Sequence, residues 1–244
     1  MVDINLEPQI EAIINGKPVP PLSDGQDSDY AFLYGQCVSS QKKSLAEAKS
    51  KEEQRWKEKN RISFFSSIRF YHNNTGFRLH SHPEKYYTGS AQQQVTCNLA
   101  HEFDNNDYFE FRPVEKTEED SSFVKDGDKV KIFHSETGAL IFTSTAFNAP
   151  QSHLQEVSCV PESQISEETE WVVKTVHGEN FVDAYSELYI FNKKASCYLG
   201  SHDVPFRIQP EGPQQQEVVC VPEMSKETVW VVFRGQLKFP NPLE

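Results

Sequence analysis

Two short segments of this 244-residue chain carry side chains suited to hydrogen-bonding a ligand. The first segment contains His80, Ser81 and His82, and the second contains Gln92 and Gln93. On a strand, His80 and His82 point to the same face, where their imidazoles could bond a sugar or a peptide. A glutamine amide both donates and accepts hydrogen bonds, which suits sugar hydroxyls. The structural alternative is that the imidazoles bond loop carbonyls and that each amide fixes a neighbouring loop.

The same pattern recurs near the C-terminus and, as a degenerate copy, in the middle of the chain. The C-terminal copy supplies Ser201, His202, Gln215 and Gln216. The middle copy has Thr143-Ser144 and Leu154-Gln155 at these positions, so it lacks the imidazole and one amide. A sugar site also needs an aromatic face, and the aromatic side chains of the first and last copies are Tyr86, Tyr87 and Phe206. We therefore predict weak glycan or glycopeptide binding at the first or third copy and none at the second.

Three cysteines mark the period of this repeat. Cys97, Cys159 and Cys220 end equivalent segments that lie 62 and 61 residues apart, and self-similarity at a fixed period indicates a repeat fold. Each copy contains four short segments of alternating apolar and polar residues between turn signals, which is the pattern of half-buried strands. Gly76 and Gly138 supply the positive φ that a tight hairpin needs. The sequence thus predicts about twelve strands in a closed all-β body.

The motif residues resemble a known family. Leu-His-Ser-His at 79–82, Gln-Gln-Gln-Val-Thr at 92–96 and Asp-Asn-Asn at 104–106 are similar to the MIR domain. This domain is a β-trefoil found in protein O-mannosyltransferases, stromal-cell-derived-factor-two-like proteins, and inositol trisphosphate and ryanodine receptors. The third copy most resembles the luminal MIR region of dolichyl-phosphate-mannose–protein mannosyltransferases. The resemblance covers about residues 63–236 and implies a β-trefoil with repeats one (63–123), two (124–184) and three (185–236).

Composition excludes several classes of partner. The net charge of −12 argues against nucleic acid, whose binding needs cationic side chains on phosphates, and against an anionic membrane surface. No run approaches the roughly 18 apolar residues of a membrane span, so we expect no membrane insertion by this segment. No signal peptide is visible at the N-terminus. We expect no cofactor, and no C-x₂-C pair indicates a zinc site.

The chain offers neither a clear metal site nor a catalytic centre. A metal at His80 and His82 would need His72 or Asp104 as third ligand, and the spacing supports neither. No G-x-S-x-G elbow or phosphate-binding glycine-rich loop is present. The five cysteines leave at least one thiol free or paired between chains. The three aligned cysteines are either small core residues or disulfide partners, and geometry decides between the two.

Residues 1–62 form an N-terminal extension. The proline-rich segment 17–22 predicts an extended connector, and residues 30–34 could form a short strand or a docked segment. Residues 42–60 predict a charged, solvated helix, with favourable Glu47–Lys51 and Glu53–Lys57 pairs. Residues 237–244 form a proline-broken tail. The sequon Asn73-Asn74-Thr75 falls on a hairpin tip, so Asn73 is a candidate glycosylation site or a simple turn residue.

The resemblance implies a non-catalytic binding module in the endoplasmic reticulum lumen, as part of a membrane-bound mannosyltransferase. Its expected partners are an acceptor polypeptide or a mannosyl glycan, and the membrane-embedded catalytic part of the same enzyme. The family's catalytic carboxylate lies in another loop, so whether the parent protein is an enzyme stays open. The alternatives are a soluble chaperone-associated protein of the stromal-cell-derived-factor-two type and the ligand-binding region of a calcium-release channel. The channel region would need a basic pocket for inositol phosphate.

Overall fold

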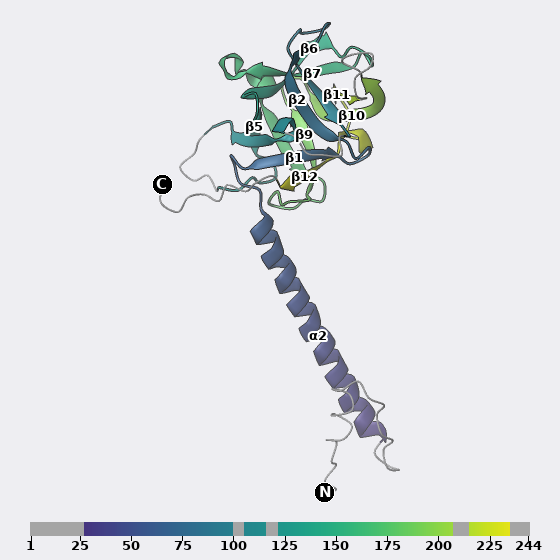
Figure 1. The fold of residues 1–244 in the computed structure, drawn as a ribbon. Helices are drawn as coiled ribbons and strands as arrows, with labels where there is room; N and C mark the ends of the chain where they lie inside the picture. The colour runs from purple at the N-terminus through teal and green to yellow at the C-terminus, as the bar shows by residue number, and fades with distance from the viewer. Residues whose placement is uncertain (1–26, 100–104, 116–121, 207–214, 235–244) are drawn as a thin grey trace. The chain divides into compact units, whose positions relative to one another are not determined.

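The computed structural model describes residues 27–99, 105–115, 122–206 and 215–234 (Figure 1). The expected connector at 17–22 and the expected tail at 237–244 lie outside the described residues. The chain divides into two units, Met1–Trp56 and Lys57–Glu244, which are described separately.

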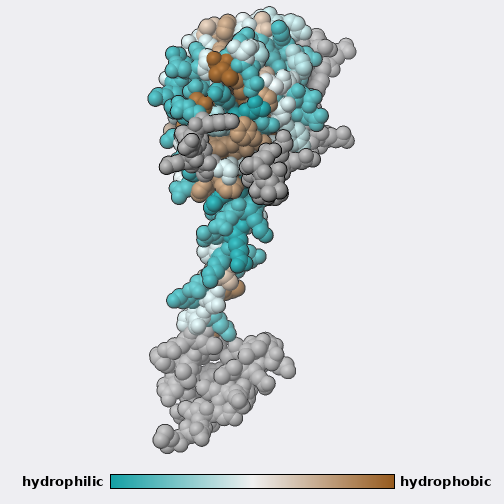
Figure 2. Space-filling view, turned by 90° about the vertical axis from the view of Figure 1, so that its left-hand side faces the viewer, coloured by the Kyte–Doolittle hydropathy of each residue, from teal (hydrophilic) through white to brown (hydrophobic). Residues whose placement is uncertain are grey.

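One long helix, α2, extends from Asp27 to Asn60. The sequence-based start at residue 42 is therefore wrong, and so is the short strand at 30–34, because that backbone is helical. No proline interrupts residues 27–60, so the backbone can stay helical throughout. Side chains 39–59 are all exposed, and their surface is mostly hydrophilic (Figure 2). Polar residues thus surround this part of the helix instead of forming one polar face.

Twelve strands and four short 3₁₀ turns form the rest of the described structure. The strands are β1 (Ser67–His72), β2 (Arg78–Lys85), β3 (Gln93–Asn98), β4 (Phe109–Pro113), β5 (Lys129–His134), β6 (Ala139–Asn148), β7 (Gln155–Pro161), β8 (Trp171–Thr175), β9 (Glu187–Asn192), β10 (Cys197–Phe206), β11 (Gln215–Val221) and β12 (Trp230–Arg234). The 3₁₀ turns are η1 (Asn105–Asp107), η2 (Glu162–Gln164), η3 (Glu167–Thr169) and η4 (Lys226–Thr228). The predicted hairpin glycines Gly76 and Gly138 both have φ of 71°, which confirms their role.

Antiparallel pairing closes the strands into two rings. In the first ring, β1 pairs with β4, β4 with β5, β5 with β8, β8 with β9, β9 with β12, and β12 with β1. In the second ring, β3 pairs with β7, β7 with β11, and β11 with β3, so that the hairpins β2–β3, β6–β7 and β10–β11 meet. The sheet is all antiparallel, and the architecture is consistent with the β-trefoil that the resemblance implies.

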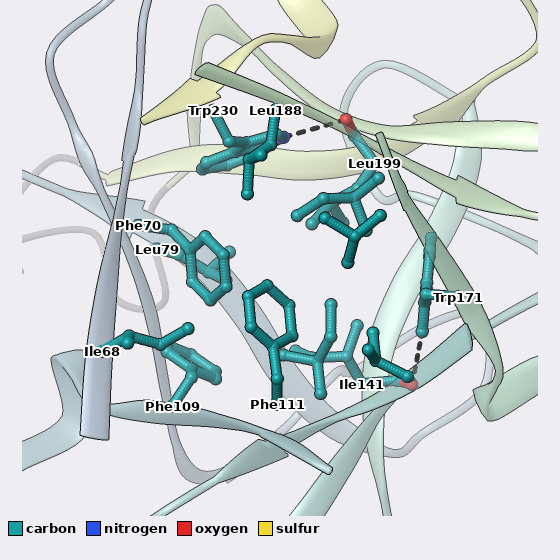
Figure 3. Packing of buried hydrophobic residues seen from close by; sticks show 14 of the residues in the cluster. Ile68, Phe70, Leu79, Phe109, Phe111, Ile141, Trp171, Leu188, Leu199 and Trp230 are labelled. Carbon is teal, nitrogen blue, oxygen red and sulfur yellow. Dashed lines mark hydrogen bonds between the residues drawn. The ribbon is translucent and has the colours of Figure 1, made fainter. Parts of the chain in front are cut away.

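The core repeats the same positions in each copy. Trp171 and Trp230 are fully buried, and their indole N–H groups donate to Ile141 O at 3.1 Å and Leu199 O at 2.9 Å (Figure 3). Phe109 is buried at the start of β4, as each tryptophan is at the start of its strand. Each such side chain contributes roughly 1.5–3 kcal/mol through burial alone. The apolar alternation in the sequence therefore marks the inward face of each strand.

Three extended segments close one end of the first ring. Ile62 N donates to Val182 O at 2.8 Å, Val182 N to Val124 O at 2.9 Å, and Val124 N to Ile62 O at 2.9 Å. All three side chains are fully buried. Ile62 thus lies in the core, although the sequence assigned it to the extension. A closed triangle of this kind satisfies backbone groups that would otherwise be buried without partners.

Candidate functional site

A hydroxyl at one position holds each of the three hairpins together. Ser81 Oγ donates to Gln94 O at 2.6 Å across β2–β3. Thr143 Oγ1 donates to the Glu156 carbonyl at 2.8 Å, and Ser201 Oγ donates to the Glu217 carbonyl at 2.8 Å. These three hydroxyl side chains are fully buried. Ser81 and Ser201, two predicted ligand contacts, are therefore interior hairpin residues.

The aligned glutamines connect neighbouring copies. Gln93 Nε2 donates to Ser81 Oγ at 2.8 Å and to Thr137 Oγ1 at 2.9 Å, and Thr137 lies in the turn between β5 and β6. Gln155 Nε2 likewise donates to Thr143 Oγ1 at 2.8 Å. The structural alternative for these amides is thus realised for Gln93 and Gln155, although their partners are side chains rather than backbone groups.

Thr137 also forms a hydrogen bond with a buried histidine, His134. His134 Nε2 lies 3.1 Å from Asn106 O, a carbonyl that can only accept, so Nε2 carries the proton. His134 Nδ1 then accepts from the Thr137 hydroxyl at 2.7 Å. His72 is arranged in the same way, between Thr75 at 2.9 Å and Glu227 O at 3.0 Å. Burial lowers the pKa of His72, which keeps its imidazole in the neutral form that this arrangement requires.

His80 belongs to a buried ionic cluster. Its Nδ1 donates to Asp107 Oδ1 at 3.0 Å, and Arg78 Nε donates to Asp107 Oδ2 at 2.9 Å. Asp107 is 1% exposed, so its charge is compensated inside the protein. The sequence analysis missed Asp107, and the only available signal was its place directly after the Asp-Asn-Asn motif. The proposed third metal ligand Asp104 lies outside the described residues.

His82 is the more accessible of the two motif histidines. The rings of His80 and His82 have centroids 5.3 Å apart, which confirms that both side chains lie on one face of β2. His82 Nδ1 also contacts the exposed carboxylate of Glu84. The predicted pair is thus divided between a buried structural residue and a partly exposed one.

The candidates of repeat three are buried. His202 Nδ1 accepts from Val204 N at 3.2 Å, and its Nε2 lies 3.7 Å from Glu217 Oε2. Gln215 and Gln216 are 4% and 6% exposed, and their side-chain oxygens have no hydrogen-bond partner among the described residues. None of these three residues lines the hollow described next.

A hollow of about 780 Å³ lies between the copies that we call repeats one and two. Its lining comes from the end of β2, the loop before β3, the β5–β6 turn and the region around η2, and comprises Pro83, Lys85, Ser90, Ala91, Gln92, Gln93, Glu136, Thr137, Gly138, Ala139, Cys159, Pro161 and Gln164. Gln92 and Gln93 are the predicted ligand residues that reach it. Gln92 Oε1 also accepts from Ser158 at 2.7 Å. The sequence did not indicate Lys85, Glu136 or Gln164, because three separate segments bring them together.

The hollow offers hydrogen-bond donors and acceptors but no aromatic wall. Lys85 is an ammonium donor, Glu136 is a carboxylate acceptor, and Gln164 is an amide with both functions. The expected stacking residues Tyr86 and Phe206 are instead 5% exposed and pack on each other, with ring centroids 6.0 Å apart. The Tyr86 hydroxyl reaches Val95 O and Val157 O. Both rings are thus interior and are not available to stack on a sugar.

Two buried carboxylates hold loops of adjacent copies. Glu156 accepts from the backbone N–H and hydroxyl of Ser90, a residue of the hollow. Glu217 accepts from Gln151 N at 2.6 Å and Ser152 N at 3.0 Å. Burial raises the pKa of Glu156. Repeat one has the amide of Gln94 at the same position of its hairpin, directly after the aligned glutamine.

The three aligned cysteines differ in whether they form a disulfide. Cys220 forms a disulfide with Cys197, with Cα atoms 5.4 Å apart. Cys97 and Cys159 are free and buried, and burial raises the pKa of each thiol to about 12. Protonated thiols are poor nucleophiles. Of the three aligned cysteines, Cys97 and Cys159 are thus core residues, whereas Cys220 is a disulfide partner.

Comparison with known proteins agrees with this architecture. The family model of the MIR domain matches residues 22–173 and 79–232. The chain belongs to the MIR domain family. A stromal cell-derived factor 2-like protein of Arabidopsis thaliana is 30% identical over 176 residues, which cover 71% of this chain and 79% of that protein. The dolichyl-phosphate-mannose–protein mannosyltransferase 1 of Saccharomyces cerevisiae is 29% identical over 184 residues, which cover 69% of this chain and 22% of that protein.

Solved MIR-containing structures show the same two relationships. The crystal structure of the Arabidopsis protein superposes with a TM-score of 0.66 at 28% identity, covering 73% of this chain and 99% of that one. The Saccharomyces cerevisiae protein O-mannosyltransferase Pmt1-Pmt2 complex bound to the sugar donor gives 0.63 at 26% identity, covering 75% and 27%. This MIR chain therefore spans about a quarter of the mannosyltransferases and most of the smaller relatives. None of its described helices is long and apolar enough to cross a membrane.

Proposed function

We propose that this chain is a non-catalytic MIR binding module that takes a hydroxyl-rich ligand, either a mannosyl glycan or the glycosylated segment of an acceptor polypeptide, in the hollow between repeats one and two. The observation that carries the proposal is the lining of that hollow. Lys85, Glu136 and Gln164 converge there from three segments. Such mixed donors and acceptors match the hydroxyls of a sugar.

We further infer that the strand-paired body is a β-trefoil of three repeats. Two rings of paired strands support this inference. So do three sets of contacts that recur with the same period: the hydroxyls of Ser81, Thr143 and Ser201, the backbone triangle of Ile62, Val124 and Val182, and the core positions Leu79, Ile141 and Leu199. A β-trefoil places equivalent loops around one axis, so a ligand site can be built from two neighbouring copies.

We propose the endoplasmic reticulum lumen as the compartment. A disulfide between Cys197 and Cys220 supports an oxidising environment. In this proposal the module belongs to a mannosyltransferase, and its partner is the membrane-embedded part of that enzyme. The Pmt1-Pmt2 complex of the yeast relative, bound to the sugar donor, motivates this assignment.

A titration followed by NMR tests the ligand class. The isolated chain is titrated with mannose, a mannosylated serine/threonine peptide and the same peptide without sugar. We expect shifts at Lys85, Gln92 and Gln164 with the two mannosyl ligands. Lys85→Ala should weaken binding several-fold, since a hydrogen bond contributes about 0.5–1.5 kcal/mol. Lys174→Ala, at an exposed position of β8 outside this lining, is the matched control.

Two outcomes would contradict this proposal. Equal effects of Lys85→Ala and Lys174→Ala would remove the hollow as the site, and so would ligand shifts confined to the 143–155 hairpin. A transfer assay with dolichyl-phosphate-mannose tests the non-catalytic part. We expect no mannosyl transfer by the purified chain, because the sequence carries no G-x-S-x-G elbow and the resemblance places the family's catalytic carboxylate in another loop.

A second candidate is a soluble module of the stromal cell-derived factor 2 type. Sequence similarity supports it, because the Arabidopsis relative is 30% identical to this chain over 176 residues. The two candidates differ in ligand preference. A module that binds polypeptide irrespective of its sugars should bind the bare peptide as tightly as the mannosylated one, so the third arm of the titration separates them.

A further inference from the structure

The Asn73-Asn74-Thr75 sequon lies on the exposed turn that follows β1. Asn73 and Asn74 are exposed, whereas Thr75 is partly buried and its hydroxyl is held by His72. Gly76, with φ of 71°, closes the turn. The position of Asn73 is therefore fixed by the buried His72, while its amide stays at the surface.

Strand register places Asn73 and Tyr71 on one outer face of the sheet. Tyr71 pairs with Val231, and Val231 pairs with Glu187, so their side chains lie in a row on the outer face of β1, β12 and β9. Asn73 Nδ2 donates to Glu187 Oε1 at 3.3 Å. The side chain of Asn73 therefore reaches the same outer face as Tyr71, two residues before it.

Tyr71 is part of an outward-facing group that we call the aromatic patch, formed by Tyr71, Phe233 and Tyr185. The ring of Phe233 lies 4.3 Å from that of Tyr71 and 4.9 Å from that of Tyr185, centroid to centroid. Tyr185 is 58% exposed, and Tyr71 and Phe233 are partly exposed. Nothing in the proposed ligand hollow involves these residues.

Tyr185 also has an unfavourable backbone. Its φ is 74°, a left-handed conformation that is costly for a bulky residue. Gly127 has φ of 85° in a turn with the same hydrogen-bond pattern: Gly127 N donates to Val173 O, and Tyr185 N donates to Val232 O. Phe65, with φ of 62°, makes the equivalent bond from its N–H to Phe111 O, so an exposed aromatic residue occupies this position in two of the three copies. The backbone strain therefore does not by itself mark Tyr185 for a function, and its ring contact with Phe233 is what places it in the patch.

We propose that Asn73 carries an N-linked glycan and that its first N-acetylglucosamine packs on the aromatic patch. The proposal rests on the luminal location given under the proposed function. One pyranose face presents C–H bonds of partial positive charge, which suit the negative face of an aromatic ring. Glycosylation also removes one Asn73 N–H, and Glu187 then accepts from the acetamido N–H of the sugar.

The modification is an ordinary group transfer. A polyprenyl-diphosphate-linked oligosaccharide supplies the sugar. The bond from its anomeric carbon to the diphosphate oxygen breaks, the anomeric carbon bonds to Asn73 Nδ2, and Nδ2 loses one proton. The lipid diphosphate leaves with the bonding electrons, so no oxidant or reductant is needed. Thr75 completes the acceptor sequon.

Expression behind a heterologous signal peptide in a eukaryotic cell tests the site. This route delivers the chain to the glycosylation machinery whatever its natural location, so a failure would not reflect on the proposed function. We expect a mobility shift that peptide-N-glycosidase removes. Asn73→Gln should abolish the shift, and the matched variant Asn74→Gln should keep it. A chain without the shift, or a shift that persists in Asn73→Gln, would overturn the assignment.

Thermal unfolding tests the packing on the patch. An endoglycosidase that leaves a single N-acetylglucosamine on Asn73 isolates the contribution of the first sugar. We expect this form to melt about 2–4 °C above Asn73→Gln, a shift within reach of a weak contact in a domain of this size. The difference should vanish in Tyr71→Ala and persist in Tyr198→Ala, whose ring lies in another aromatic group with Phe191.

Two results would refute the packing. An unchanged difference in Tyr71→Ala would show that the sugar does not use the patch. Concentration-dependent dimerisation of Asn73→Gln that Tyr185→Ser abolishes would identify a second copy of the chain as the natural cover instead.

Discussion

The hairpins β2–β3 and β6–β7 have the same skeleton but different chemistry. Both use a buried hydroxyl to reach across the hairpin, Ser81 in one and Thr143 in the other, and both use an aligned glutamine to bond that hydroxyl. Only the first carries His80 bonded to Asp107. In the second hairpin the position of His80 is occupied by Phe142. Contacts present in both hairpins serve the fold, so function has to be sought where the hairpins differ.

The 3₁₀ turns before the aromatic strands differ in the same way. Repeat one ends its turn with the buried Asp107, which pairs with Arg78. Repeat two ends its turn with Thr169, which donates to Ser166 O at 2.7 Å and accepts from Ser166 N at 3.3 Å. Repeat one thus has an ionic cluster where repeat two has a neutral capping contact. We expect the largest loss of stability when this ionic cluster is broken.

Asp107→Ala should be the most damaging change. It removes a carboxylate that compensates the buried Arg78 guanidinium, and breaking a buried pair costs about 3–5 kcal/mol. Thr169→Ala is the matched control in repeat two and should cost about 1 kcal/mol, the typical loss for a capping residue. Urea unfolding of both variants measures the two values. If they were equal, the ionic cluster would have no special role in repeat one.

Removing the disulfide should rank second. The Cys197–Cys220 bond closes a loop with a sequence separation of 23, and such bonds contribute about 2–4 kcal/mol. Reductant should therefore lower the urea midpoint of the wild type and leave that of a Cys197→Ala/Cys220→Ala variant unchanged. Cys97 and Cys159 are already reduced. A midpoint insensitive to reductant would show that this third hairpin needs no covalent link.

Thr137→Val should have an intermediate effect. The change leaves the buried His134 Nδ1 without its donor, which costs about 1–3 kcal/mol. It also takes one of two acceptors from Gln93, whose amide keeps its bond to Ser81. Thr75→Val removes the corresponding partner of His72, and among the described residues no glutamine bonds Thr75. We expect the Thr75 variant to be the more stable one in thermal melts. If the Thr137 variant were instead the more stable one, the bond from Gln93 to Thr137 would not contribute to the stability of the protein.

Glu156→Gln should have the smallest effect and a distinctive pH dependence. Because burial raises the pKa of Glu156 above 4.5, the folded state retains a proton that the unfolded state has released. Stability contributed by this group is therefore lost as pH rises from 4.5 through the raised pKa. Glu156→Gln copies Gln94 of repeat one and should flatten that decline. Unfolding curves across this pH range measure it, and identical slopes for both proteins would contradict the assignment.

The sequence by itself predicted the all-β class, most of the strands and the hairpin turns. Alternation and the recurring cysteines identified the hairpins, and Gly76 and Gly138 marked the left-handed turn positions, because these features depend on neighbouring residues. The sequence-based bounds of the helix were wrong. The charged pattern predicted a helix over 42–60 only, whereas residues 27–41 are helical as well. Local pattern did not place the start of the helix, because several residues of capping type lie close together at 23–29.

Tertiary structure alone decided the chemistry of the candidate residues. Nothing in the sequence says that Ser81 bonds across a hairpin, that Cys220 pairs with Cys197 while Cys159 stays reduced, or that Lys85 and Gln164 face one hollow. Each of these facts depends on which strands close the rings, and ring closure brings together residues many positions apart. Side-chain type fixes what a residue can bond, but burial and distance decide which bond it makes.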